Sequence, residues 1–195
     1  IMIQDTVKLD YSDVLIVPQF SDIDSRSKVD IDYNPVIASN MDGVGTFEMA
    51  KELAKVGAHT AIVKHYKFQD WCKFSSTVNE TTLKHIYVST GISREDIELT
   101  ERIANLLFDE HGIYVNICVD VANGYMKQFY ETVEFLKRKS PRSKIMAGSV
   151  VTAKAVRRLE DAGADLIKVG IGSGAVCTTR IKTGIGYPQF SAVME

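Results

Sequence analysis

The sequence lacks the features that mark membrane, secreted and nucleic-acid-binding proteins. None of its apolar runs reaches the ~18 residues of a membrane span, and its first residues show no signal-peptide pattern. Its 23 basic and 25 acidic residues nearly cancel, leaving a net charge of -2. A chain with so little net charge has no electrostatic preference for nucleic acid or a membrane surface, so we expect neither as a partner.

Cysteine and proline are also scarce, with three and four residues among 195. Cys72, Cys118 and Cys177 are widely separated, form no CxxC pair and have no histidine cluster nearby. An odd, scattered set argues against a disulfide framework and against a zinc site. Reduced thiols of this kind predict a cytoplasmic protein.

What the sequence does contain is a regular alternation of apolar, β-rich runs and amphipathic helical patterns. The predicted strands are Pro35–Asn40, Thr60–Lys64, Ile86–Ser89, Tyr114–Asp120, Lys144–Ala147 and Asp165–Gly170. The predicted helices are Thr46–Val56, Lys67–Val78, Ser93 to about Glu110, about Tyr125 to Lys139, and Thr152 to about Ala162. A spacing of roughly one strand per 25–30 residues favours a (β/α)8 barrel over a doubly wound sheet.

A complete barrel usually needs about 250 residues, whereas this chain supplies six βα units. We therefore expect residues 1–195 to be a single catalytic barrel domain that stops before strands seven and eight. Three explanations stay open: an excerpt of a longer protein, a split gene product whose partner supplies the rest, and a half-barrel that self-associates. The first is favoured because both ends of the chain are abrupt.

The segment after the sixth predicted strand is the strongest candidate for a functional loop. Gly170, Gly172 and Gly174 give Ile171–Gln189 a flexible backbone, and the loop delivers Cys177. A cysteine at the carboxyl end of a parallel strand is a candidate nucleophile. The alternative is a small buried hydrophobic residue, which is what most free cysteines are.

The motif GSGAVCTTRIKTGIGYPQFSA in this loop resembles the catalytic loop of the GMP reductase branch of the IMP dehydrogenase/GMP reductase family. LDYSDVLIVP, NMDGVGTFEMA, VKHYKFQDW and ICVDVANGY extend the resemblance along nearly the whole chain. CTTR is common to both branches, whereas KTGIGYPQ and DVANGY favour the reductases. The regulatory domains that usually interrupt the dehydrogenase barrel have no room between Ile62–His65 and His85–Ser89.

The resemblance implies NADPH-dependent reductive deamination of GMP to IMP and ammonia. In that reaction Cys177 attacks C2 of the purine and forms a covalent thioimidate, and Thr179 takes part in proton transfer. Ser39 and Met41 match residues that border the purine. The phosphate site, the mobile flap and the proton-transfer glutamate of the family would follow Glu195, so we expect this segment alone to be inactive.

The resemblance also assigns the cofactor and a cation. The positions that match NADPH contacts are Ser25, Arg26, Lys64, Asp120, Val121, Ala122, Ile171 and Gly172. Arg26 and Lys64 suit phosphate groups, although without the resemblance ordinary surface charge is the favoured interpretation of both. The backbone carbonyls of Gly172, Gly174 and Cys177, with Arg180 as a weaker addition, match a monovalent cation site, generally potassium.

Two further expectations follow from the resemblance. Relatives assemble as tetramers, and Ser25 and Arg26 are expected to act across a subunit interface. Ser173 occupies a position where many relatives have proline, which predicts a less rigid loop. The alternative functions are an IMP dehydrogenase without regulatory domains, distinguished by a preference for NAD and IMP, and a non-catalytic barrel fragment that acts in assembly.

Overall fold

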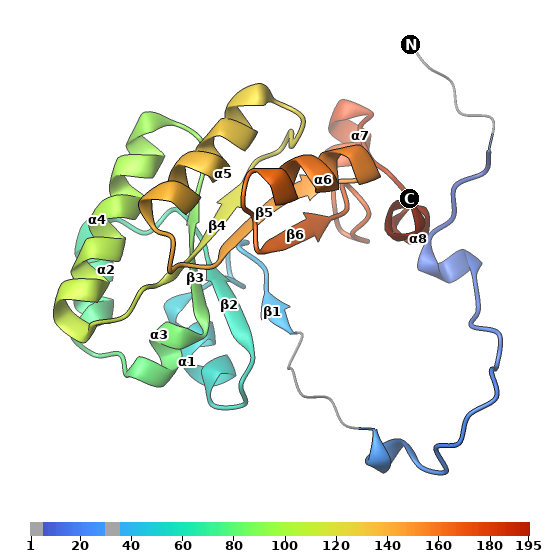
Figure 1. The fold of residues 1–195 in the computed structure, drawn as a ribbon, viewed down its shortest axis with the longest axis horizontal. Coiled ribbons are helices and arrows are strands. Elements are labelled where there is room, and N and C mark those ends of the chain that lie inside the picture. The colour runs from blue at the N-terminus through green and yellow to red at the C-terminus, as the bar shows by residue number, and fades with distance from the viewer. Residues whose placement is uncertain (1–5, 30–35) are drawn as a thin grey trace.

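The computed structural model describes residues 6–29 and 36–195. Six parallel strands form one curved sheet in the order β1 to β6, and each strand pairs with the next one along the chain (Figure 1). The strands are β1 Ile37–Ala38, β2 His59–Ile62, β3 Ile86–Thr90, β4 Asn116–Asp120, β5 Ile145–Val150 and β6 Leu166–Val169. This arrangement confirms the incomplete (β/α)8 barrel that the sequence predicts.

The two faces of the sheet follow the two-residue period of the strands. On the concave face, one residue from each strand contributes to a single apolar layer, made of Ile37, Ala61, Tyr87, Cys118, Met146 and Leu166. Inward-facing side chains arranged in layers are how a barrel of this type fills its interior. On the opposite face, residues such as Ile86, Val88 and Ile117 pack against the helices.

Eight α-helices are assigned among the described residues, and the larger ones cover the outer face of the sheet (Figure 1). They are α1 Phe47–Ala54, α2 Phe68–Ser75, α3 Glu80–Lys84, α4 Arg94–His111, α5 Lys127–Lys139, α6 Ala153–Asp161, α7 Thr179–Thr183 and α8 Gln189–Met194. Hydroxyl caps fix three of the starts, since Thr46, Ser93 and Thr152 each accept a hydrogen bond from a backbone amide of the first turn.

Two element predictions need correction. The predicted helix Lys67–Val78 ends at Ser75, and α3 begins separately because the Asn79 side chain accepts a hydrogen bond from the Thr82 amide at 2.8 Å. The predicted loop Ile171–Gln189 contains α7, which ends where Gly184 adopts a left-handed conformation with φ of 70°. The glycine spacing hides this short helix, because glycine stands on both sides of it.

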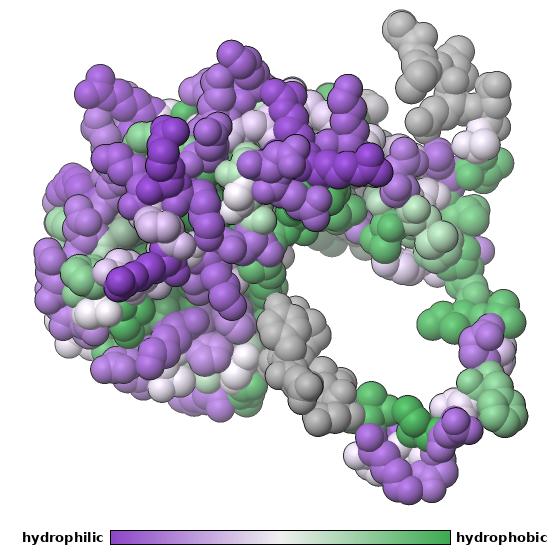
Figure 2. All heavy atoms as spheres, viewed as in Figure 1, coloured by the Kyte–Doolittle hydropathy of each residue, from purple (hydrophilic) through white to green (hydrophobic). Residues whose placement is uncertain are grey.

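The amino-terminal segment lies outside the barrel wall. Of the predicted first strand, Pro35 falls outside the described residues, and β1 is short. Residues 6–29 pass beside α8 and then loop outward from the sheet (Figure 1), and hydrophobic side chains are interspersed with hydrophilic ones along them (Figure 2). Leu15, Ile16 and Phe20 are at least 95% exposed. Among the described residues, no helix combines the length and apolarity that crossing a membrane requires.

Candidate functional site

The predicted site residues gather, with two exceptions, where the parallel strands reach their carboxyl ends. Ser39 and Met41 follow β1, Lys64 follows β2, Asp120 ends β4, and the loop that carries Cys177 follows β6. Since all six strands are parallel, these ends lie along one edge of the sheet. The same edge receives Val121 and Ala122 from the β4 turn and Ile171 and Gly172 from the β6 turn.

A lysine that was not among the predicted site residues joins two parts of this edge. The Lys168 ammonium donates to the Asp120 carboxylate and, at 3.3 Å, to the side-chain oxygen of Asn40. Asn40 lies between the two residues predicted to border the purine, whereas Asp120 is a predicted cofactor contact. Lys168 therefore connects the predicted substrate side of the edge to its predicted cofactor side.

The strand register explains how these groups meet. Asp120 pairs with Gly148 on β5, and Gly148 pairs with Lys168 on β6. A Cβ atom at Gly148 would lie 2.6 Å from the Lys168 Cβ, so only glycine leaves room for the lysine stem. A lysine inside the apolar run DLIKVG is a signal in the sequence, because an unpaired ammonium is rarely buried in a strand.

Lys64 has a charged neighbour as well. Its ammonium lies 3.7 Å from the Asp96 carboxylate at the start of α4, with both side chains partly exposed. A side chain at Gly91 would collide with that carboxylate, at 2.2 Å from its oxygen. The Asp96 carboxylate thus orients the Lys64 ammonium, which stays accessible to solvent. An ammonium of this kind is a suitable partner for a phosphate group.

The Cys177 thiol is placed beside the start of α7. Its Sγ lies 3.3 Å from the Thr179 hydroxyl oxygen. Hydrogen bonds from the Thr179 side chain and backbone, with a smaller contribution from the Arg180 charge, lower the pKa of Cys177 below that of an ordinary thiol. Cys118, by contrast, lies in the apolar layer of the sheet, and burial raises its pKa to about 11. Of these two thiols, only Cys177 has a nucleophile's environment.

The predicted cation ligands belong to the same loop. Gly172 has φ of 68°, and a side chain there would collide with the Arg180 stem at 2.9 Å. The Gly174 carbonyl accepts a hydrogen bond from the Cys177 amide at 3.0 Å, which leaves it a second lone pair. Backbone carbonyls in a tight glycine turn are the oxygen donors that a potassium ion takes, so the residues present fit such an ion.

Two predicted cofactor residues are not brought to this edge. Ser25 and Arg26 are exposed and lie at the start of a 3₁₀ turn, Arg26–Lys28, in the segment outside the barrel wall. Their described hydrogen bonds are local, with the Ser25 hydroxyl meeting Ser27.

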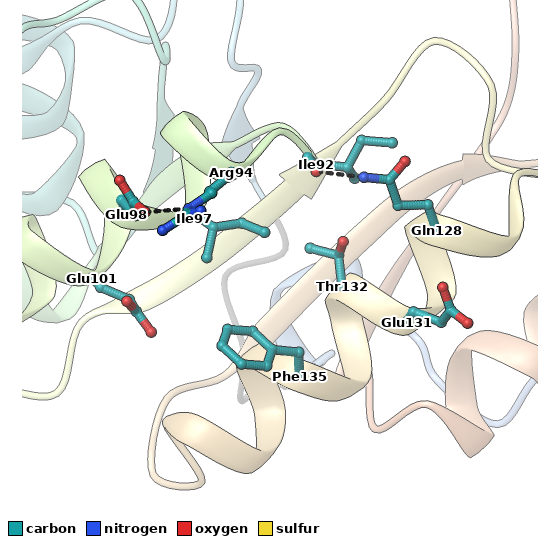
Figure 3. Close-up of a pocket in the computed structure, with 9 residues that line it drawn as sticks. All are labelled: Ile92, Arg94, Ile97, Glu98, Glu101, Gln128, Glu131, Thr132 and Phe135. Atoms are coloured by element: carbon teal, nitrogen blue, oxygen red, sulfur yellow. Dashed lines mark hydrogen bonds and ion pairs between the residues drawn. The ribbon is translucent and has the colours of Figure 1, made fainter.

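A cavity of about 420 Å³ lies elsewhere, between α4 and α5 on the outer face (Figure 3). Ile92, Ile97 and Phe135 supply its apolar lining, and Arg94 on its wall is paired with Glu98 at 2.7 Å. None of the predicted site residues lines this cavity. Among the described residues, no group of three or more histidine, cysteine or acidic side chains could hold a metal ion.

Comparison with known proteins identifies the relatives of this chain. The family model described as IMP dehydrogenase / GMP reductase domain matches residues 8–195. GMP reductase 2 from Bos taurus is 48% identical over 206 aligned residues, and GMP reductase from Citrobacter koseri is 45% identical over the same length. Each alignment covers 99% of this chain.

A solved structure gives the same picture at the level of the fold. The crystal structure of inosine 5′ monophosphate dehydrogenase from Legionella pneumophila matches with a TM-score of 0.80 at 30% identity, over 97% of this chain. The chain spans 58% of the length of that structure and 58% of each of the two reductases.

Proposed function

The chain belongs to the IMP dehydrogenase/GMP reductase family, and on this premise we propose that it supplies the nucleophile and the cofactor side of an NADPH-dependent GMP reductase. The observation that carries the proposal is the pairing of Cys177 with Thr179 at the carboxyl edge of the sheet. Similarity to enzymes named GMP reductase, at 45–48% identity, supports the choice of reaction.

In the proposed reaction the Cys177 thiolate adds to C2 of the guanine ring. The 2-amino group takes up a proton and leaves as ammonia, so that the purine remains attached to the sulfur as a thioimidate. The lowered pKa of Cys177 favours the thiolate, the nucleophilic form, more than in an ordinary cysteine. Thr179, whose hydroxyl contacts the sulfur, would pass a proton toward the leaving group.

Charged groups on the same edge would hold NADPH, which when bound supplies the hydride that reduces C2. Lys64 suits one of its phosphates, and Asp120 suits a hydroxyl or amide donor. Lys168 keeps the Asp120 carboxylate in a fixed position. The carbonyls of Gly172, Gly174 and Cys177 would bind a potassium ion and thereby set the shape of the loop.

The remaining parts of the proposal concern the assembled protein. We propose a cytoplasmic homotetramer in which Ser25 and Arg26 complete the cofactor site of a neighbouring subunit. The exposure of both residues, away from the site of their own chain, supports this role. We also propose that residues 1–195 alone are inactive, because the partners expected for the 5′-phosphate are not among them.

The test follows the absorbance of NADPH in the full-length protein supplied with GMP and potassium. We expect oxidation of NADPH that requires GMP, is lost in Cys177→Ala, and falls in Thr179→Val. Cys72→Ala, which removes a thiol from α2, is the matched control and should retain activity. Reduction of NAD with IMP as substrate, and no reaction with GMP, would instead identify an IMP dehydrogenase. Binding of neither nucleotide would identify a non-catalytic barrel.

A further inference from the structure

The side chain of Gln189 spans the start of the loop that carries Cys177. Its Nε2 donates to the Val169 carbonyl at 2.9 Å, and its Oε1 accepts from the Ser173 hydroxyl at 2.7 Å. Val169 ends β6, whereas Ser173 lies four residues farther along the chain. One amide group therefore holds together the two ends of the turn that leads toward Cys177.

The chemistry of the two partners fixes which way this amide points. A backbone carbonyl can only accept, so the NH₂ group must face Val169. The amide oxygen then faces Ser173, where a hydroxyl can donate to it. Gly170 leaves space for the arrangement, since a Cβ there would lie 2.3 Å from the Gln189 oxygen. A glutamate of nearly the same shape would place a carboxylate against the Val169 carbonyl with no donor.

The backbone of the same residue is tied to the amino-terminal segment. The backbone amide of Gln189 donates a hydrogen bond to the Asp10 carboxylate at 2.6 Å. Next to it, the amide of Leu9 donates to the Ser191 hydroxyl at 2.7 Å, and the Ser191 amide donates to the Leu9 carbonyl at 3.0 Å. The backbone of Gln189 is thus hydrogen-bonded to a segment about 180 positions earlier in the chain, while its side chain is hydrogen-bonded to the loop that carries Cys177.

We propose that Gln189 is a positioning residue for Cys177, and that Ser173 is its partner. This proposal rests on the function proposed above for the Cys177 loop. The Ser173–Gln189 hydrogen bond restrains the loop by a polar link at the position where the resemblance leads one to expect proline. Fixing the turn at Val169 and Ser173 sets where Gly174 and Cys177 lie, and so where the thiol meets the purine.

The test uses the full-length protein and three variants. Gln189→Glu removes the donor to Val169, and Ser173→Ala removes the hydroxyl. Gln128→Glu is the matched control, because the Gln128 amide also donates to a backbone carbonyl, that of Ile92, at 3.0 Å and away from the site. Each variant is measured for kcat and KM, for the rate at which iodoacetamide alkylates Cys177, and for its melting temperature.

We expect Gln189→Glu to lower kcat by roughly tenfold or more with little change in KM, since misplacing a reacting group affects the chemical step. The pH profile of Cys177 alkylation should shift in the same variant. Ser173→Ala should lower kcat and shift the alkylation profile to a smaller extent. Gln128→Glu should change neither kcat nor the profile. Unchanged Cys177 alkylation and kcat in folded Gln189→Glu and Ser173→Ala proteins would overturn the proposal.

Two features of the experiment distinguish a failure of this proposal from a failure to fold and from a failure of the proposed function. If Gln189→Glu does not fold, Ser173→Ala decides the matter by itself, because it removes one hydrogen bond and adds no charge. If the protein has no GMP reductase activity, the proposed function fails, yet the alkylation profile still reports whether Gln189 positions the thiol.

Discussion

Replacing Lys168 by methionine should separate its structural contribution from its contribution to cofactor binding. The Lys168 and Asp120 side chains are 25% and 36% exposed, so their ion pair is neither fully buried nor fully solvated. Exposed pairs contribute roughly 0–1 kcal/mol, and breaking a buried pair costs about 3–5 kcal/mol. A value between these, about 2 kcal/mol, is the expected loss in the free energy of unfolding.

Lys137→Met is a matched control for this measurement. The Lys137–Asp165 pair, at 2.9 Å, has nearly the same exposure, 29% and 35%, and lies at the opposite end of β6. Both variants should lose a similar free energy of unfolding in urea denaturation followed by circular dichroism. Only Lys168→Met should also raise the KM for NADPH, by roughly tenfold, because a carboxylate without its cation loses its orientation.

Two results would refute this reasoning. If Lys168→Met leaves the free energy of unfolding within about 0.5 kcal/mol of the parent while Lys137→Met lowers it, the Lys168–Asp120 pair contributes nothing to stability. If both variants lose stability equally and neither changes the KM for NADPH, Lys168 has a structural role only. Adding Asp120→Asn to Lys168→Met should restore part of the lost stability, because no charge is then left unpaired.

Three further predictions concern the thiols, one histidine and the amino-terminal segment. Alkylation of Cys177, followed by mass spectrometry across a pH series, should show an inflection below that of an ordinary thiol, and Thr179→Val should raise it. Cys118 should stay unmodified in the folded protein, because a pKa raised from 9.0 to about 11 lowers its thiolate population roughly a hundredfold; its modification at a comparable rate would contradict the assigned burial. Burial and neighbouring basic groups lower the pKa of His59, so the unfolded chain binds its proton more readily and stability should fall as pH drops through about 6.5. His59→Gln should flatten that part of the urea-midpoint profile, and an unchanged slope would count against the shift. Arg26→Ala should raise the KM for NADPH in the assembled protein without changing the melting temperature, whereas an unchanged KM would remove Arg26 from the cofactor site.

Local patterns were sufficient to predict the architecture. The alternation of apolar strands and amphipathic helices, with hydroxyl caps such as Ser93, predicted six parallel βα units, and the structure has them in that order. The errors arose where a local capping or turn signal, which the periodic pattern of apolar residues does not contain, decides where a helix begins or ends. Asn79 caps a short helix, α3, just beyond the end of the predicted helix Lys67–Val78, and a five-residue helix after Cys177 lies between glycines that indicated a loop.

The sequence by itself determined which residues are chemically suited to a site and on which loop they lie, because both depend on residues close together in the chain. Only the tertiary structure decided which of them meet. Lys168 contacts Asp120 and Asn40 at sequence separations of 48 and 128, and Gln189 contacts Asp10 at a separation of 179. The Lys168–Asp120 contact depends on strand register and on the space that Gly148 leaves between neighbouring strands. Register is a property of the packed sheet and not of any single segment, so no local pattern could have predicted these contacts.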